Sequence, residues 1–134
     1  MIIQSFASAI ARDDPNDYAK FCTSDVVFVH RPSGNIIRGL CAVSASFTSW
    51  RREFSVLTPE ILDAFASQDR AVAQLHWIGR HKSRNSHVDF VGCCVLALRE
   101  EKLCEIVDFY DGATYQLQVD GAHAPRRWAP PDGV

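Results

Sequence analysis

Helical and extended sequence patterns occupy opposite halves of this chain, and their separation limits the folds that it can adopt. Near the N-terminus, apolar residues recur at the i, i+3, i+4 and i+7 positions that define one helix face: Ile3, Phe6, Ala7 and Ile10. From Pro59 onward, β-rich runs are separated by short polar turns. Helices gathered early and strands gathered late predict an α+β domain, because α/β folds need the two patterns to alternate.

Three helices and a strand pair are expected before Pro59. Asp14 is suited to cap a short second helix that has Pro15 at its first position. A β-rich run at 26–30 is followed by a turn and by a returning arm at 36–38. After Gly39, steps of three and four residues predict a third helix with one apolar face, made of Leu40, Val43, Phe47, Trp50 and Phe54.

Four strands joined by short turns are expected next, over residues 59–66, 70–82, 87–98 and 103–111. Three helices packed on one face of a curved sheet leave a cone whose open end is a pocket. The single domain, 1–134, is therefore expected to have its core at about 3–112. Residues 113–134, which contain three prolines, are predicted to form an irregular tail.

The composition excludes several functional classes. With 134 residues, the chain has room for one domain and is too short for a two-domain dehydrogenase or a kinase. Its formal net charge of −2 argues against a nucleic-acid partner, since binding phosphates requires a basic surface. No apolar run approaches the roughly 20 residues of a membrane span, and the N-terminus lacks the basic start of a signal peptide. We therefore expect a cytoplasmic protein without a membrane partner.

The cysteines and histidines form no recognisable cofactor motif. The five cysteines are odd in number and include no Cys-x-x-Cys pair, which favours small buried hydrophobic residues in a reducing cytoplasm over disulfides. His76 and His81 lie five residues apart in one expected strand and point to opposite faces, so no metal site is expected. Because no glycine-rich phosphate loop is present, we expect no nucleotide and no other cofactor.

Two stretches of the chain resemble the nuclear-transport-factor-two-like superfamily. The stretch from Phe21 to Gly34, with Gly39 beyond it, is similar to the family's acidic turn, strand, polar residue and glycine turn before a helix. The stretch from Lys102 to Asp111 is similar to its closing strand, which ends in an Asp-aromatic-aromatic-Asp pattern. The relevant branch contains SnoaL-type polyketide cyclases, ketosteroid isomerase and limonene-epoxide hydrolase. The resemblance implies a cone-shaped curved antiparallel sheet wrapped around three N-terminal helices, a cystatin-like α+β barrel.

Asp108 is the first candidate catalytic residue. Period-two alternation places it on one strand face with Cys104, Ile106 and Tyr110, a largely apolar face that should look into the cone. Burial raises the pKa of a carboxyl group and suits it to proton transfer near neutral pH. The resembling cyclases and epoxide hydrolase have an acid/base carboxylate at this point of the closing strand. The alternative is that Asp108 fixes a loop or a helix end.

His30 is the second candidate catalytic residue. It ends a strand whose inward face also carries Val26 and Phe28, at the place where ketosteroid isomerase has its proton-shuttling aspartate. Because an imidazole titrates near neutral pH, His30 could act as a general base or as the partner of Asp108. The alternative is a hydrogen-bonded histidine at the pocket rim.

The chain departs from two members of this branch. Phe6 and Cys94 occupy the places of the isomerase's oxyanion-hole donors, and neither gives a strong hydrogen bond to an enolate. Where the hydrolase has an arginine and a second aspartate, this chain has Leu75 and Trp77, which should face inward. SnoaL-type sites, which rely on few polar groups, are the best match.

These observations lead to one expected function and one alternative. We expect a cofactor-independent acid/base enzyme of cyclase, isomerase or hydrolase type that acts on a small hydrophobic or polyketide-like molecule. The alternative is a non-catalytic ligand-binding or dimerisation module. A homodimer is expected through the outer sheet face, where Gln74, His76 and Ile78 alternate with inward residues. With Asp108 and His30 as catalytic residues, the expected substrate-binding residues are Trp77, Tyr110, Phe28, Phe47, Trp50, Leu75, Cys94 and Phe6.

Overall fold

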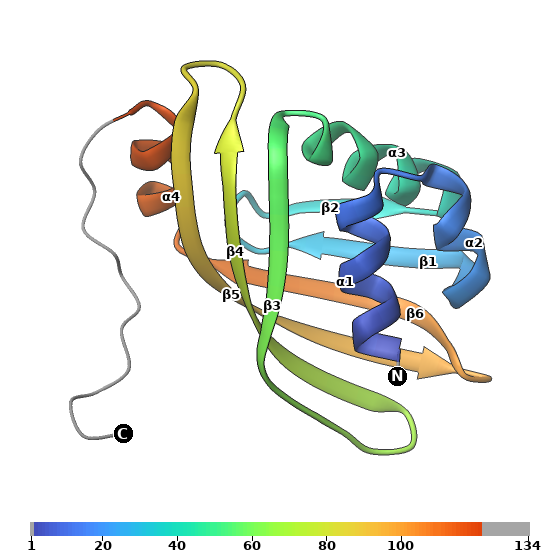
Figure 1. Ribbon diagram of the computed structural model, residues 1–134. Coiled ribbons are helices and arrows are strands. Elements are labelled where there is room, and N and C mark those ends of the chain that lie inside the picture. Colours follow the sequence, from blue (N-terminus) through green and yellow to red (C-terminus); the bar gives the residue numbers. More distant parts are fainter. Residues whose placement is uncertain (1, 122–134) are drawn as a thin grey trace, which may run out of the picture.

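A computed structural model describes residues 2–121, which form a curved sheet with helices on its concave face (Figure 1). The helices are α1 (Ile2–Arg12), the short 3₁₀ helix η1 (Pro15–Asp17), α2 (Tyr18–Phe21), α3 (Leu40–Arg51) and α4 (Gly112–Val119). The strands are β1 (Cys22–His30), β2 (Asn35–Arg38), β3 (Phe54–Ala66), β4 (Arg70–His81), β5 (Ser86–Arg99) and β6 (Lys102–Tyr110).

The six strands form one sheet in the order β2-β1-β6-β5-β4-β3. Neighbouring strands are antiparallel except β1 and β6, which pair in parallel with His30 opposite Asp108. The sheet curves so strongly that β3 and β4 run across the direction of β1 and β2 (Figure 1). The expected α+β cone is confirmed with two refinements. The barrel is not closed, because β2 and β3 remain as edges, and one strand pair is parallel.

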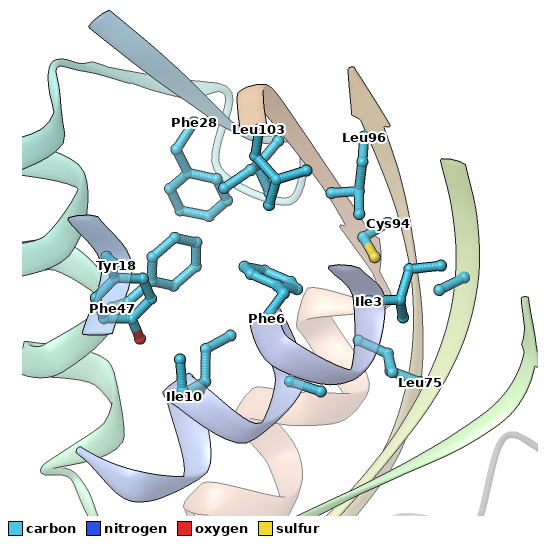
Figure 2. Packing of buried hydrophobic residues seen from close by; sticks show 14 of the residues in the cluster. Ile3, Phe6, Ile10, Tyr18, Phe28, Phe47, Leu75, Cys94, Leu96 and Leu103 are labelled. Atoms are coloured by element: carbon cyan, nitrogen blue, oxygen red, sulfur yellow. The ribbon is translucent and has the colours of Figure 1, made fainter. Parts of the chain in front are cut away.

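Side chains from α1, α2, α3 and the concave sheet face form one core. Phe6 reaches from α1 into the space between Phe28 and Phe47 on one side and Cys94 on the other (Figure 2). The ring of Phe47 on α3 is central, since its centroid lies 5.6 Å from that of Phe6, 5.5 Å from Tyr18 and 4.6 Å from Phe28. Full burial of such a side chain contributes about 1.5–3 kcal/mol, so this cluster holds the helices on the sheet.

Two local signals act as the sequence predicts. Asp14 has an extended backbone before η1, and its carboxylate accepts a hydrogen bond of 3.0 Å from the N–H of Asn16. Gly39, which precedes α3, has a φ of 93°, a region that glycine enters without the steric cost of a side chain. Its N–H donates to the carbonyl of Val26 and ties the start of α3 to β1.

The expected place of Phe54 on the third helix is wrong. α3 ends at Arg51, and Phe54 instead opens β3, where it pairs with His81. The helical spacing is misleading because the chain turns back between Trp50 and Phe54. Their ring centroids lie 5.1 Å apart although the two residues belong to different elements. β3 therefore begins at Phe54 rather than at Pro59.

The predicted irregular tail is also wrong in the part that the structure describes. Residues Gly112–Val119 form α4, and Asp111 caps it by accepting hydrogen bonds from the N–H groups of Ala113 and Thr114. We expected Asp111 to be the last strand residue, but β6 ends at Tyr110, and Asp111 is the N-cap residue of α4. The predicted tail beyond residue 121 lies outside the described residues.

α4 covers part of the edge of β5. β6 pairs with β5 only from Gly92 onward, so the earlier residues of β5 extend past it. The Gln118 side chain takes the place of a neighbouring strand there. Its amide oxygen accepts from the N–H of Asp89, and its amide nitrogen donates to the Asp89 carbonyl, both at 2.9 Å. The Ser86 hydroxyl adds a 2.9 Å hydrogen bond to the carbonyl of Val119.

The described residues also bear on the cysteines and on the membrane expectation. All five cysteines are free, and Cys22 and Cys94 are buried as expected. The prediction is corrected for the other three: Cys93 and Cys104 are only partly buried, and Cys41 is exposed because α3 turns it away from its buried face. Within residues 2–121, no helix has the length and apolar character needed to span a membrane.

We expect Gln118→Ala to lower the free energy of unfolding by about 1–3 kcal/mol, because it leaves the N–H and carbonyl of Asp89 without these partners. Urea unfolding measures the change. Gln116→Ala is the matched control, since the same helix then loses only an exposed hydrogen bond to Asp120, at an expected cost below about 0.5 kcal/mol. Equal effects of the two substitutions would contradict the edge-covering role of α4.

Candidate functional site

A cavity of about 180 Å³ lies between α1, α3 and the concave face of the sheet. The structure brings together every residue that the sequence assigned to the site, and all ten line this cavity: Asp108, His30, Trp77, Tyr110, Phe28, Phe47, Trp50, Leu75, Cys94 and Phe6. Seven further residues complete the lining: Ile10, Asn35, Ile37, Ser46, Phe90, Gly92 and Ile106. The placement of the ten residues is thus established, whereas their roles in binding and chemistry stay predictions.

Some of the missed lining residues had a usable sequence signal. Phe90 and Gly92 alternate with outward residues on β5 and share a face with Cys94, so the period-two rule could have found them. Asn35 and Ile37 had no such signal. They lie on the short strand β2, and their inward face depends on its register with β1.

Asp108 projects from β6 into the cavity. It lies opposite His30 in the parallel β1–β6 pair, so both side chains occupy the concave face. Burial raises the pKa of Asp108 to about 7, and the N–H of Phe109 opposes this shift only in part. At neutral pH the carboxyl group therefore exists in both its charged and neutral forms, as a group that accepts and returns protons requires.

Gly92 leaves space beside Asp108. It lies opposite Tyr110 in the β5–β6 pair. A Cβ atom at position 92 would lie 3.0 Å from the carbonyl oxygen of Phe109 and 3.9 Å from Oδ1 of Asp108. A side chain there would push against β6 and crowd the carboxylate. The glycine thus keeps Asp108 accessible from the cavity.

His30 uses both ring nitrogens in hydrogen bonds. Nδ1 lies 2.6 Å from Oγ of Ser33, and Nε2 lies 2.7 Å from the hydroxyl oxygen of Tyr110. Partial burial lowers the pKa of His30, so the imidazole is neutral at neutral pH. A neutral ring donates through one nitrogen and accepts through the other. The hydrogen-bonding neighbour of His30 in the cavity is therefore Tyr110.

Aromatic rings make up much of the remaining cavity wall. The Trp50 ring stands edge-on to Trp77, with centroids 5.5 Å apart, and Phe90 lies 5.4 Å from Tyr110. The indole N–H of Trp50 donates to the hydroxyl of Tyr115 at 3.2 Å, so α4 supports this wall from outside the lining. Such a wall favours an apolar or ring-shaped molecule.

The described lining residues include no lysine or arginine, and Asp108 is the one carboxylate among them. Burial raises the pKa of the Cys94 thiol to about 12, so this residue is not a thiolate nucleophile at neutral pH. Phe6 offers no polar hydrogen at all. Both places that hold oxyanion donors in the resembling isomerase therefore face the cavity without a strong donor, as the sequence predicts.

The outer face of the sheet is not exposed throughout. His76 lies on that face, as predicted, but it is only 3% exposed. Its Nε2 hydrogen-bonds to Asp89, and its Nδ1 lies 3.5 Å from Oε2 of Glu60. Over the residues that the structure describes, no group of three or more potential metal ligands is arranged to hold an ion.

A six-stranded cone with a buried carboxylate on its last strand defines a class of small α+β proteins. The sequence pattern of the SnoaL-like domain family matches residues 3–106, and the chain belongs to this family of the nuclear-transport-factor-two-like superfamily. The match ends before Asp108 and Tyr110, so it does not cover these two polar cavity residues at the end of β6. No curated protein matches the sequence significantly.

Several solved structures share the fold. A protein from Catenulispora acidiphila, described as hypothetical with a ketosteroid isomerase-like fold and in complex with trimethylamine, superposes with a TM-score of 0.82 at 19% identity, covering 96% of this chain and 97% of its own. A structure from Jannaschia, described as a candidate SnoaL-like polyketide cyclase, superposes with a TM-score of 0.77 at 12% identity. The match covers 88% of this chain and 90% of its own. A structure from Streptomyces antibioticus, described as a candidate polyketide cyclase, has a TM-score of 0.77 at 13% identity. The match covers 89% of this chain and 96% of its own. At these identities the likeness shows the fold alone.

Asp108 should make the protein less stable as the pH rises from about 4 to 7. An aspartate in an unfolded chain titrates near about 3.9, whereas the pKa of Asp108 in the folded protein is about 7. Between these values only the folded state holds the proton, so raising the pH removes at most about 1.4 kcal/mol of stability per pH unit. Asp108→Asn should flatten this dependence, and urea unfolding at several pH values measures it.

Asp63→Asn, which neutralises an exposed carboxylate on β3, is the control and should leave the pH dependence as it is. An unchanged dependence in Asp108→Asn would assign the effect to other groups and would remove the basis for a raised pKa at Asp108.

Proposed function

We propose that this protein is a cofactor-independent acid/base enzyme, of cyclase, isomerase or hydrolase type, acting on a small hydrophobic or polyketide-like molecule. The observation that carries the proposal is Asp108, a carboxyl group with a pKa of about 7 that faces an aromatic cavity. Membership of the SnoaL-like family and the likeness to structures described as polyketide cyclases support this reaction class.

The proposed chemistry is a proton transfer at carbon. The charged form of Asp108 takes a proton from a carbon atom next to a carbonyl group, which leaves an enolate and a neutral carboxyl group. In an isomerisation, the carboxyl group returns the proton to a different atom of the enolate. In a cyclisation, the enolate carbon attacks a second carbonyl of the same molecule, and the proton goes to the new alkoxide.

The cavity also indicates which molecules fit. With one carboxylate, no basic side chain among the described lining residues and many aromatic rings, it disfavours anions and favours uncharged, ring-containing molecules. A similar structure is in complex with trimethylamine, which supports the binding of a small molecule. His30, with both nitrogens hydrogen-bonded, reaches a bound molecule through Tyr110 or through water.

The test is deuterium uptake from D₂O at the carbon next to the carbonyl group in a panel of cyclic ketones, followed by proton NMR. The wild-type protein should accelerate exchange of at least one ketone, and Asp108→Asn should lower that rate by about 10²–10⁴-fold. Asp63→Asn should exchange at the wild-type rate. A ketone that binds, as measured by tryptophan fluorescence, but shows no accelerated exchange would favour the alternative, a ligand-binding module without catalysis.

We also propose that two copies of the chain pair through the outer face of the sheet. One apolar row crosses all six strands in register, and its members are Ile36, Val29, Val107, Val95, Val72 and Phe65. The ends of this row are open, since Ile36 is 54% and Phe65 is 65% exposed. A second copy of the same face would cover this row and remove its apolar surface from water.

Val95→Glu, which places a charge in the middle of the row, should convert a dimer to a monomer in light scattering after size-exclusion chromatography. Lys82→Glu alters the charge of an exposed turn and should leave the dimer intact. A wild-type protein that is monomeric at micromolar concentration would rule out the proposed pairing.

A further inference from the structure

Three side chains form a continuous line of hydrogen bonds that ends in the cavity. Ser33 lies in the turn between β1 and β2, His30 ends β1, and Tyr110 ends β6. Oγ of Ser33 is 2.6 Å from Nδ1 of His30, and Nε2 of His30 is 2.7 Å from the hydroxyl oxygen of Tyr110. Because His30 is neutral, one of its ring nitrogens donates and the other accepts. The nitrogen that carries the hydrogen therefore sets the direction of donation along all three side chains.

The distances around Ser33 favour one of the two directions. Its oxygen accepts a hydrogen bond from the N–H of Asn35 at 3.3 Å, so its own hydrogen must find an acceptor. The carbonyl oxygen of His30 is 3.5 Å away and already accepts a 2.8 Å bond from the N–H of Gly34. Nδ1 of His30 is the nearer acceptor by almost an ångström. With the Ser33 hydroxyl donating to Nδ1, its nearer acceptor, the hydrogen of the imidazole lies on Nε2.

This tautomer settles what Tyr110 can do. With Nε2–H donating to its oxygen, the Tyr110 hydroxyl cannot donate back to His30, so its hydrogen is available to an acceptor in the cavity. Tyr110 lies two residues after Asp108 on the same face of β6, and both line the cavity. Burial raises the pKa of Tyr110, so the phenol stays protonated at neutral pH. Rings of Phe90 and Tyr115 pack against it and limit its movement.

We propose that Tyr110 is a hydrogen-bond donor to the oxygen atom of the bound molecule, and that Ser33 and His30 are positioning residues that hold it in the donating orientation. This proposal rests on the proposed function and makes it more specific. Removing a proton beside a carbonyl group puts negative charge on the carbonyl oxygen, and a fixed donor at that oxygen stabilises the enolate. Tyr110 would supply the donor that Phe6 and Cys94 do not.

The arrangement also selects substrates. A molecule that uses both groups must place a carbonyl oxygen at the Tyr110 hydroxyl and an acidic C–H at Asp108. The two residues are separated by one residue on a single strand. Ketones and related carbonyl compounds with a hydrogen on the adjacent carbon meet this condition, whereas hydrocarbons and ethers of the same size do not.

The direction of the line is tested without any ligand. ¹⁵N NMR distinguishes the two neutral histidine tautomers, and loss of signals in His30→Gln assigns the His30 resonances. We expect the hydrogen on Nε2 in the wild type and in Ser33→Thr, which keeps the hydroxyl. Ser33→Ala should increase the Nδ1–H form, because the hydroxyl donor to Nδ1 is lost. An Nδ1–H tautomer in the wild type would overturn the proposal.

The donor role of Tyr110 is tested in the deuterium-uptake assay. Tyr110→Phe should lower kcat by about 10²–10³-fold, as expected for the loss of one oxyanion donor, with KM changed much less. Ser33→Ala should lower kcat by a smaller factor, and Ser33→Thr should restore it. Asp63→Asn, which changes an exposed side chain on β3 away from the cavity lining, should retain the wild-type rate. A Tyr110→Phe variant with wild-type kcat would overturn the donor role.

The two proposals can fail separately. If the wild-type protein exchanges no ketone, the proposed function fails, while the ¹⁵N spectra still decide the direction of the hydrogen bonds. If exchange depends on Asp108 but not on Tyr110, the proposed function stands and this inference fails.

Discussion

The contacts of one ring, Phe47, position the helices of this molecule on its sheet. From α3 it packs on Phe6 of α1, stacks on Tyr18 of α2 and meets Phe28 of β1. The cavity extends from this cluster toward the ends of β1 and β6, where a strongly curved sheet is not filled by the helices. Interiors packed to ordinary density have little space larger than a water molecule, so an opening of this kind is the candidate binding site of the molecule.

The fold shifts the pKa values of two aspartates, Asp17 and Asp108, in opposite directions. Hydrogen bonds from Lys20 and Arg12 hold the pKa of Asp17 below its usual value, and that residue serves structure. Asp108 has no cation among the described lining residues, and burial drives its pKa upward. Burying this carboxyl group without a nearby cation destabilises its charged form, and a group with such a perturbed pKa is typical of a functional site. Tyr110 and His30 beside it add a neutral hydrogen-bonding group rather than a second charge.

α4 supports the aromatic wall of the cavity, although its sequence signal is weak. Gln118 satisfies the backbone of Asp89, and Tyr115 accepts the indole hydrogen of Trp50, so one helix secures both a sheet edge and the aromatic wall. Neither contact could be derived from spacing, because glutamine and tyrosine on a short helix have no pattern that indicates their partners. The misassigned Phe54 is a separate case, since the turn after α3 places its ring against the ring of Trp50 at a spacing that resembles a helix.

The sequence by itself determined the α+β order, the inward faces of β1, β4 and β6 and the ten predicted lining residues, because alternation and helical spacing follow from local backbone geometry. Tertiary structure alone decided the features that depend on separate strands meeting. The parallel pairing of β1 with β6 set His30 opposite Asp108, and the ends of both strands brought Tyr110 to Nε2 of His30. His30 and Tyr110 are 80 positions apart in the chain, and no local rule fixes the register between such distant segments.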